Sequence, residues 1–462
     1  MKKWHDKEWI RQLSERAISS SQVDTALYTK YDVKRGLRDL NGKGVLAGLT
    51  QIGEVQAHPE GDNTGPGHLI YRGLDVNDLV AGFLADGRHG FEEISYLLLF
   101  GELPTADELA DYVARIGAAR TLPDDFVHDS VLKLTSRDMM NAMAQSILAM
   151  YILDNRPEDV SIPNVLRQSL KLIAAFPLLA VYSYHSYVYY YGRGSLVIHA
   201  PRPELSTAEN FLHMLRNDSQ YTPLEAQLLD LALVLHAEHG GGNNSSFTTH
   251  VVTSTLTDTY SAIAAAMGSL KGPRHGGANA RVVAMFEDLK QAVSDWSNDS
   301  QIEDYLLKLL KKQAFDRSGL IYGVGHAVYS TSDPRTEILR DQVKKLAAEK
   351  NLSDEMDLYM RVERLAPQII SSKRKMYKGV SANVDFYSGF LYRLLGIPTE
   401  LYTPLFAIAR IVGWSAHRIE ELVNNGKIIR PAYKSIAPHR DYVPLGQRSA
   451  ENAGQSENAN AS

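Results

Sequence analysis

Apolar residues recur at helical spacing along most of the chain, and this pattern predicts a mainly α-helical fold. Helix start signals support it: Thr105 stands three residues before Glu108, and Thr222 directly precedes Pro223. From Val45 to Tyr71, apolar and polar residues alternate around a cluster of Gly, Pro and Asn, which predicts a β-hairpin. We therefore expect a helical protein with one minor β element near its N-terminus.

The stretch from Leu172 to Tyr191 is apolar and long enough to resemble a membrane span. Pro177, His185 and several Ser and Tyr residues interrupt it, and Lys171 and Arg193 flank it. We therefore interpret it as a buried or subunit-facing helix and expect no membrane association. Its six tyrosines favour a subunit interface, because aromatic residues are enriched in such surfaces.

The composition is that of a globular protein, since 44% of the 462 residues are hydrophobic, enough for two or three domains. The 49 basic and 54 acidic residues nearly balance, so the charge gives no reason to expect a nucleic-acid partner. The chain has no cysteine, which excludes disulfides, thiolate metal ligands and a cysteine nucleophile. Its N-terminal residues lack the apolar core of a secretory signal, and we expect a cytoplasmic protein.

Several histidines stand beside glycines or helix ends, where the backbone leaves room for a ligand. His275 follows a Gly-Pro helix break and precedes two glycines, and His326 follows the run Gly-Val-Gly. His236 and His239 end a predicted helix one turn apart, and they could bind a metal, cap the helix or bind an anion. Because no HExxH motif and no nearby carboxylate follows, the pair favours an anion over zinc.

Arginines occupy positions that helix stability alone does not explain. Asp333 caps a predicted helix and places Arg335 in its first turn, where the helix dipole disfavours a cation, so a bound anion explains it better. Arg410 stands within an apolar helix, where a buried arginine needs a partner. Arg430, before a proline, completes the basic set. Because arginine binds carboxylates bidentately, a dicarboxylate would account for several of these residues.

Asp385 lies among apolar residues just before a predicted helix. It could cap that helix, or, if it is buried near His275 and His326, it could act as a base. A neutral histidine can donate a hydrogen bond to a carbonyl that becomes an enolate while a carboxylate removes the adjacent proton. The residues therefore favour chemistry on a carbon acid.

Five motifs resemble the citrate synthase family, including its 2-methylcitrate synthase members. In chain order they are HAEHGGGNNSSFTTH, GPRHGGAN, GVGHAVYSTSDPR, SANVDFYSG and FAIARIVGWSAH. The resemblance implies a mainly α-helical homodimer with a minor N-terminal β-hairpin. Each subunit would have a large domain from residues 1–279 and 391–447 and a small domain from residues 280–390. The polar tail, residues 448–462, is expected to be disordered because it cannot bury a core.

The activity that the resemblance implies is an acyl transfer of the tricarboxylic acid cycle. Acetyl-CoA condenses with oxaloacetate, and the thioester is then hydrolysed to citrate and CoA. By the same resemblance, Asp385 takes the methyl proton, His275 hydrogen-bonds the thioester carbonyl, and His326 polarises and protonates the ketone. No metal or redox cofactor is implied.

The resemblance also assigns the binding residues. His239, Arg335 and Arg410 would bind oxaloacetate, and Arg430 would reach across from the other subunit. The CoA phosphates need cations, and the candidates are Lys373, Arg374, Lys375 and Lys378. An equally good interpretation of that cluster is a solvated run of surface charge.

Alternatives remain within and outside the family. A 2-methylcitrate synthase would use propionyl-CoA, and one methylene is worth about 1 to 3 kcal/mol in a pocket, so the motifs do not separate the two. A non-catalytic scaffold that binds a dicarboxylate or CoA would be expected to lose the base, yet Asp385 is present. Gly240 stands where many relatives carry glutamate, which puts in doubt an acid at that position.

Overall fold

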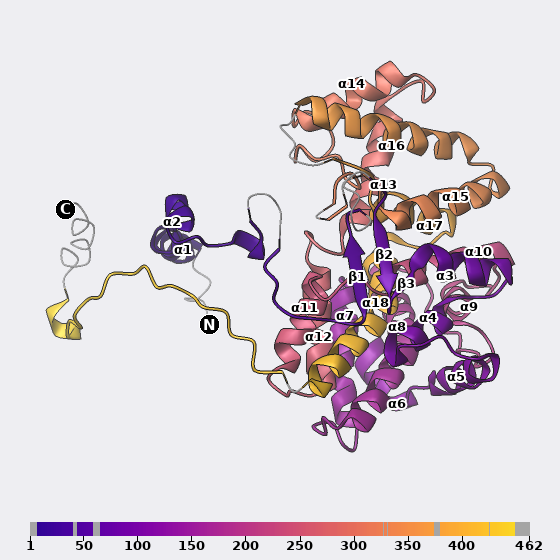
Figure 1. The fold of residues 1–462 in the computed structure, drawn as a ribbon, viewed down its shortest axis with the longest axis horizontal. Helices are drawn as coiled ribbons and strands as arrows, with labels where there is room; N and C mark the ends of the chain where they lie inside the picture. Colours follow the sequence, from indigo (N-terminus) through magenta and orange to yellow (C-terminus); the bar gives the residue numbers. More distant parts are fainter. Residues whose placement is uncertain are drawn as a thin grey trace. The chain divides into compact units, whose positions relative to one another are not determined.

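The computed structural model describes residues 7–39, 44–58, 65–326, 328–329, 331–373, 379–424 and 426–448 (Figure 1). Residue contacts group the chain into two compact units, Met1–Lys427 and Ile428–Ser462. The described part of the second unit is mostly extended and contains a 3₁₀ turn, η5, at Leu445–Gln447. The predicted disordered tail, residues 448–462, lies outside the described residues except for Arg448.

Helices dominate the first unit, which confirms the mainly α prediction. The threonines at 105 and 222 cap α5 and α10 with complete capping boxes, as the sequence predicts. In chain order the α-helices are α1 (Lys7–Ser21), α2 (Thr25–Lys30), α3 (Val76–Ala85), α4 (Phe91–Phe100), α5 (Ala106–Ala119), α6 (Asp124–Phe126), α7 (Met139–Met150), α8 (Ile162–Tyr191), α9 (Thr207–Leu215), α10 (Pro223–His236), α11 (Asn244–Thr253), α12 (Thr259–Lys271), α13 (Ala278–Ala292), α14 (Asp299–Leu310), α15 (Pro334–Glu349), α16 (Ser353–Lys373), α17 (Val384–Leu394) and α18 (Tyr402–Val423).

The predicted β-hairpin is present and carries a third strand. An antiparallel sheet is formed, in this order, by β1 (Gly53–Gln56), β2 (His68–Tyr71) and β3 (Leu74–Asp75). Tyr71 is fully buried, and its hydroxyl donates to the carbonyl oxygens of Val234 (3.0 Å) and Glu238 (3.1 Å). The sheet thereby fastens the C-terminal end of α10, the place where the sequence predicts an anion-binding histidine.

α8 and α18 pack against each other in the core of the first unit. Among the described residues, α8 is the one helix long and apolar enough to cross a membrane, but 78% of its most apolar window is buried inside the protein. Its burial agrees with the interpretation as a core helix. Tyr189, Tyr190 and Tyr191 at its end are exposed, and the subunit contact expected of them stays a prediction.

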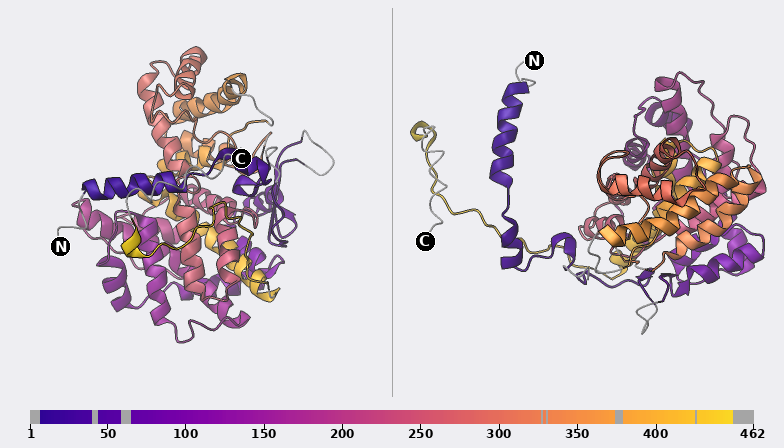
Figure 2. Two further views of the ribbon diagram at one scale, coloured as in Figure 1. Left: turned by 90° about the vertical axis from the view of Figure 1, so that its left-hand side faces the viewer. Right: turned by 90° about the horizontal axis from the view of Figure 1, so that it is seen from above.

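The helices α13 to α17 form a second group, drawn in salmon to orange in Figures 1 and 2. Within it, α17 packs on α13 and α15, and α16 packs on α14 and α15. α10 contacts both α15 and α17 and so joins this group to the other helices. The group overlaps the predicted small domain, residues 280–390. Because residue contacts keep it in one unit with the remainder of residues 1–427, the division into two domains stays a prediction.

Candidate active site

His239 follows the end of α10, which β2 and α18 hold in place. On the α18 side, Nε of Arg410 donates to the carbonyl oxygen of His236 (2.7 Å). The residue after His239 is Gly240, whose φ of +81° would strain any other side chain, including a glutamate. The imidazole of His239 lies 5.2 Å from that of His326, measured between ring centroids. Two histidines from distant motifs therefore meet.

A short backbone pairing places His326 beside the segment that carries Asp385. The amide of Gly325 donates to the carbonyl of Ser381 (2.7 Å), and the side-chain amide of Asn383 donates to the carbonyl of Gly325 (2.8 Å). Gly325 has a φ of +105°, so the turn before His326 requires glycine. Direct hydrogen bonds thus hold the segment of His326 against the segment that carries Asp385.

The hydrogen bonds of His326 determine its tautomer. Its Nδ1 accepts from the backbone amides of Val328 and Tyr329, both at 3.0 Å. A ring nitrogen that accepts hydrogen bonds carries no proton, so the neutral imidazole has its proton on Nε2. The ring also stacks on Tyr329, with centroids 4.6 Å apart. His326 is therefore oriented to donate from Nε2.

Arg335 is buried and paired with the cap of its own helix. The carboxylate of Asp333, the N-cap of α15, accepts from Nε (3.0 Å) and Nη2 (2.7 Å) of Arg335. Asp333 therefore balances part of the charge of this arginine, and the bound anion expected at Arg335 stays a prediction. Nη1 is not engaged by Asp333, and the guanidinium lies 5.9 Å from the Tyr329 ring that supports His326.

Arg410 is 1% exposed, and its guanidinium lies 4.9 Å from the ring of Phe406. Its Nη1 is buried and has no hydrogen-bond partner among the described residues. Burial lowers the pKa of Arg410 to about 10, which leaves the group charged at neutral pH. A buried charge with an unused donor supports anion binding at this position.

Asp385 is the second residue of α17 and does not cap it. The cap is Asn383, whose side chain accepts from the backbone amide of Asp385 (3.0 Å), so the capping alternative is wrong. Oδ1 of Asp385 is buried without a hydrogen-bond partner among the described residues. Burial raises the pKa of Asp385 to about 6, although the charge of Arg335 opposes the shift. Asp385 thus has the environment of a base rather than a cap.

His275 lies between α12 and α13, where the Gly-Pro break predicts a turn. Its Nε2 is 3.1 Å from Oδ1 of Asn243 and 3.2 Å from Oγ of Ser245. Nε1 of Trp414 donates to the same Ser245 Oγ (3.0 Å), so that oxygen already accepts one proton. The Ser245 hydroxyl can then donate to Asn243 or to His275, and in the second case His275 carries its own proton on Nδ1.

Burial keeps His239 and His275 neutral. It lowers the pKa of His239 well below the usual value, and the charges of Arg335 and Arg410 lower it further. Burial and then Arg410 lower the pKa of His275 to about 4. Two buried guanidinium groups beside neutral imidazoles form a site suited to a dianion, with imidazole N–H groups available to a carbonyl oxygen.

Other predicted residues contribute less. His236 is fully buried and stacks on Phe406 at 4.1 Å, and neither of its ring nitrogens has a hydrogen-bond partner among the described residues, so its anion-binding role stays a prediction. Lys373 is exposed at the end of α16. Arg374, Lys375 and Lys378 lie outside the described residues. Arg430 is exposed in the second unit, and its role stays a prediction.

The sequence reasoning missed a buried ion pair next to His239. Nε2 of His417 donates to Oε1 of Glu238 (3.0 Å), and both side chains are fully buried. Burial alone would lower the pKa of His417, but the Glu238 carboxylate outweighs it and raises the pKa to about 9. The sequence signals for this ion pair were Glu238 in the HAEH motif and His417 at the end of the FAIARIVGWSAH motif. Trp414, which supports Ser245, was missed as well.

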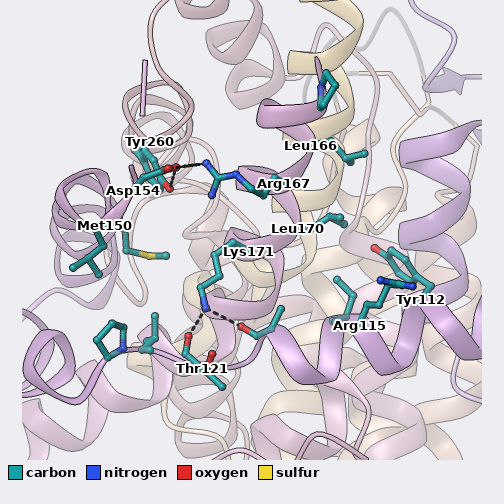
Figure 3. A pocket seen from close by; sticks show the side chains of 16 residues that line it. Tyr112, Arg115, Thr121, Met150, Asp154, Leu166, Arg167, Leu170, Lys171 and Tyr260 are labelled. Atoms are coloured by element: carbon teal, nitrogen blue, oxygen red, sulfur yellow. Dashed lines mark hydrogen bonds and ion pairs between the residues drawn. The ribbon is translucent and has the colours of Figure 1, made fainter. Parts of the chain in front are cut away.

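A cavity of about 860 Å³ lies elsewhere, between α5, α7, α8 and α12 (Figure 3). None of the predicted site residues lines it. Its cations are already engaged, because Nζ of Lys171 donates to the carbonyls of Ala119 and Thr121, and Arg167 pairs with Asp154 at 2.7 Å. We therefore place the chemistry at the histidine cleft and not in this cavity.

Known proteins resemble this chain over most of its length. The family model for the citrate synthase C-terminal domain matches residues 39–432. Among curated relatives, citrate synthase of Deinococcus radiodurans is 36% identical over 390 residues (84% of this chain, 94% of the relative), and 2-methylcitrate synthase of Shewanella oneidensis is 32% identical over 410 residues (88% and 97%).

Solved structures agree with the sequence relatives. Citrate synthase of Thermoplasma acidophilum, in a ternary complex with carboxymethyl coenzyme A and oxaloacetate, matches with a TM-score of 0.72 at 28% identity, covering 90% of this chain and 99% of that one. Citrate synthase of Pyrobaculum aerophilum matches with a TM-score of 0.70 at 32% identity, covering 88% and 94%. With the cleft assembled from the same five motifs, this chain belongs to the citrate synthase family.

Proposed function

We propose that this protein condenses acetyl-CoA with oxaloacetate and hydrolyses the resulting thioester to citrate and CoA. The observation that carries the proposal is the environment of Asp385, a buried carboxylate with one unpartnered oxygen and a pKa of about 6. A base with a pKa near the operating pH is suited to take a proton from carbon. Membership of the citrate synthase family supports the same reaction.

The first step is enolisation of the thioester. Asp385 removes a proton from the methyl carbon, and His275 donates a hydrogen bond from Nδ1 to the thioester oxygen as negative charge develops there. This assignment uses the tautomer in which the Ser245 hydroxyl donates to Nε2 of His275. The low pKa of His275 suits the role, because a neutral imidazole stabilises the enol without protonating the substrate beforehand.

The second step forms the carbon–carbon bond. The enol carbon attacks the ketone carbon of oxaloacetate, and His326 donates its Nε2 proton to the ketone oxygen, which becomes the hydroxyl of citryl-CoA. The two backbone amides that hold Nδ1 orient the ring for this donation. Water then attacks the thioester carbonyl, and CoA leaves as the thiol.

Arg335, Arg410 and His239 would bind the oxaloacetate carboxylates and carbonyl. The unused Nη1 of Arg410 supports this role, because a carboxylate would satisfy a donor that the described residues leave unpaired. Arg430 would reach the substrate of a second subunit in a homodimer, and Lys373 with its basic neighbours would contact the CoA phosphates. These last assignments rest on the family resemblance and on charge.

A second candidate substrate is propionyl-CoA. The 2-methylcitrate synthase of Shewanella oneidensis is nearly as similar to this chain as the citrate synthase relatives are. Both reactions would use the same base and the same two histidines. The choice depends on whether the thioester site accommodates one additional methylene, which changes the ratio of kcat/KM about 10- to 200-fold.

The test is release of free thiol from acetyl-CoA and from propionyl-CoA, each with oxaloacetate. We expect both activities to require oxaloacetate, with the higher kcat/KM for acetyl-CoA. Asp385→Ala should abolish thiol release from either substrate. Equal release by this variant would disprove the assigned base, and a higher kcat/KM for propionyl-CoA would make the protein a 2-methylcitrate synthase.

A further inference from the structure

A second group of histidines and carboxylates lies outside the proposed cleft. It comprises His250 on α11 and His417 and Glu420 on α18, whose ligand atoms all lie within 4.8 Å of one another. Nε2 of His250 is 3.1 Å from Nδ1 of His417, which in turn is 3.9 Å from Oε2 of Glu420. Two imidazole nitrogens and a carboxylate oxygen therefore lie close to one another.

Each imidazole is oriented by a carboxylate on its opposite side. Nδ1 of His250 lies 2.8 Å from Oε2 of Glu421, and Nε2 of His417 lies 3.0 Å from Oε1 of Glu238. Because these ring nitrogens donate to carboxylates, the remaining nitrogens are the ones that point at each other. Histidines that bind metals are typically held in this way, with the second ring N–H given to a carboxylate.

The third ligand atom of this group, Oε2 of Glu420, lacks a hydrogen bond among the described residues. Oε1 of Glu420 accepts from the backbone amide of Gln51 (2.8 Å), which fixes the side chain. Its Oε2 is buried and has no hydrogen-bond partner among the described residues. A buried carboxylate oxygen without a donor is unfavourable unless a cation satisfies it.

We propose that His250, His417 and Glu420 bind a divalent transition metal ion, with zinc as the best match. Two imidazoles and one carboxylate are a common zinc ligand set and are poor ligands for magnesium or calcium, which prefer oxygen. Tetrahedral bonds of about 2.0–2.1 Å place the ligand atoms roughly 3.3 Å apart. The separations of 3.1 Å and 3.9 Å lie close to this value, and the third pair, His250 and Glu420, lies within 4.8 Å. Water would complete the coordination.

A proton is the natural competitor of the metal. The Glu238 carboxylate keeps the pKa of His417 near 9, so this imidazole is protonated at neutral pH. The proton on its Nδ1 then points at Nε2 of His250. Burial, and then the charge of His417, hold the pKa of His250 below its usual value, so its Nε2 lone pair is available. Glu238, Glu420 and Glu421 supply negative charge for either cation.

The site would join α11 to α18 close to His239, through the contact between Glu238 and His417. Glu238, which orients His417, is the neighbour of His239 in the chain, and the added Cβ of a residue at Gly241 would lie 3.4 Å from the His417 ring. A bound ion would thus fasten the loop that carries the proposed oxaloacetate-binding histidine. This role is separate from the condensation chemistry and does not depend on the proposed function.

The test is metal binding by the full-length protein after chelation and dialysis. Calorimetric titration with Zn²⁺ at pH 8 should show one saturable site per chain, and Co²⁺ should give the visible absorption of a tetrahedral nitrogen and oxygen site. His250→Ala and Glu420→Gln should remove both signals, whereas Glu421→Gln should weaken binding about 10- to 100-fold by releasing the oriented imidazole. His128→Ala, at an exposed histidine, is the matched control and should bind as the wild type does.

Two results would overturn the proposal. One is the absence of saturable binding by the wild type at pH 8. The other is wild-type binding by folded His250→Ala, and loss of that binding in His326→Ala would then assign the ion to the cleft histidines. Circular dichroism of each variant confirms that loss of binding does not reflect unfolding.

Discussion

Two groups of histidines in this protein differ in their hydrogen-bond partners. In the cleft group, His275 contacts neutral side chains, His326 accepts from backbone amides, and Nε2 of His239 has no hydrogen-bond partner among the described residues. The cluster group, His250 and His417, has carboxylates on its outer sides. Burial is similar in the two groups, but the pKa of His275 falls to about 4 while that of His417 rises to about 9.

The comparison shows that a carboxylate partner outweighs burial at His417, whose pKa rises to about 9, but not at His250, where burial and the charge of His417 keep the pKa below its usual value beside Glu421. Glu238 and His239 are adjacent in the chain, yet the carboxylate of Glu238 pairs with His417 and leaves His239 without an anionic partner. The cleft keeps neutral imidazoles and cationic arginines, as a dianionic substrate requires. The cluster group concentrates negative charge around two imidazoles and so favours a proton or a metal ion.

The largest effect is expected from the carboxylate of Asp385, the proposed base. Asp385→Asn removes the proposed base but keeps its shape, and we expect kcat for thiol release to fall about 10²- to 10⁴-fold. Asp341→Asn, at an exposed aspartate on α15, is the control and should retain wild-type activity. Activity within a few-fold of wild type in Asp385→Asn would show that another group takes the proton.

The same variant should be more stable than the wild type. Because the folded protein holds Asp385 with a pKa of about 6, against 3.8 in the unfolded chain, the folded state binds more protons between these values. Stability conferred by the protonated form is therefore lost as the pH rises from 4 to 6. Urea unfolding at pH 7.5 should show a gain of up to about 3 kcal/mol in Asp385→Asn, with no gain at pH 3.5.

The next largest effect is expected when the ion pair between Glu238 and His417 is broken. Glu238→Gln leaves a buried imidazole without its carboxylate, and we expect the free energy of unfolding to fall by about 3 to 5 kcal/mol at neutral pH. Asp111→Asn breaks the exposed pair with Arg115 and should change stability by less than about 1 kcal/mol. Urea denaturation measures both. Equal effects of the two variants would mean that the buried pair adds no net stability.

The pH dependence of stability should have opposite signs in the two groups. The folded pKa of His275 lies near 4, below its unfolded value of 6.5, so this residue reduces stability as the pH falls through that window. The folded pKa of His417 lies near 9, so its contribution is complete below pH 6.5 and is lost as the pH rises to 9.

Two variants test the acid and the alkaline parts of the stability-against-pH curve separately. His275→Gln should flatten the acid limb, and His417→Gln should flatten the alkaline limb, each by up to about 3 kcal/mol. Urea midpoints measured from pH 4 to pH 10 give both slopes, and His128→Ala provides the control because its side chain is exposed. Parallel profiles for the two variants would contradict the contrast between the groups.

The sequence predicts much of the fold and the histidines of the candidate site, but not the carboxylates that pair with Arg335 and His417. Periodicity and caps predict the helices, and glycines beside His275 and His326 predict room for a ligand. Asp333 and Glu238 show where such reasoning stops. Asp333 both caps α15 and pairs with Arg335, which weakens the argument that the arginine needs an anion. Glu238 reaches a histidine 179 residues away, and local spacing carries no information about such a contact.

The smallest expected effect tests how the cleft sets the tautomer of His275. Ser245→Ala removes the hydroxyl that can donate to Nε2, while Asn243 can still accept from that nitrogen. The imidazole should then favour its Nε2 proton and lose the Nδ1 donor proposed for the thioester oxygen. One neutral hydrogen bond is worth about 0.5–1.5 kcal/mol, so kcat should fall roughly 2- to 10-fold with little change in KM for oxaloacetate. Thr248→Ala, on the exposed side of α11, is the matched control. A rise in KM with unchanged kcat would place Ser245 in substrate binding and leave the tautomer of His275 to Asn243 alone.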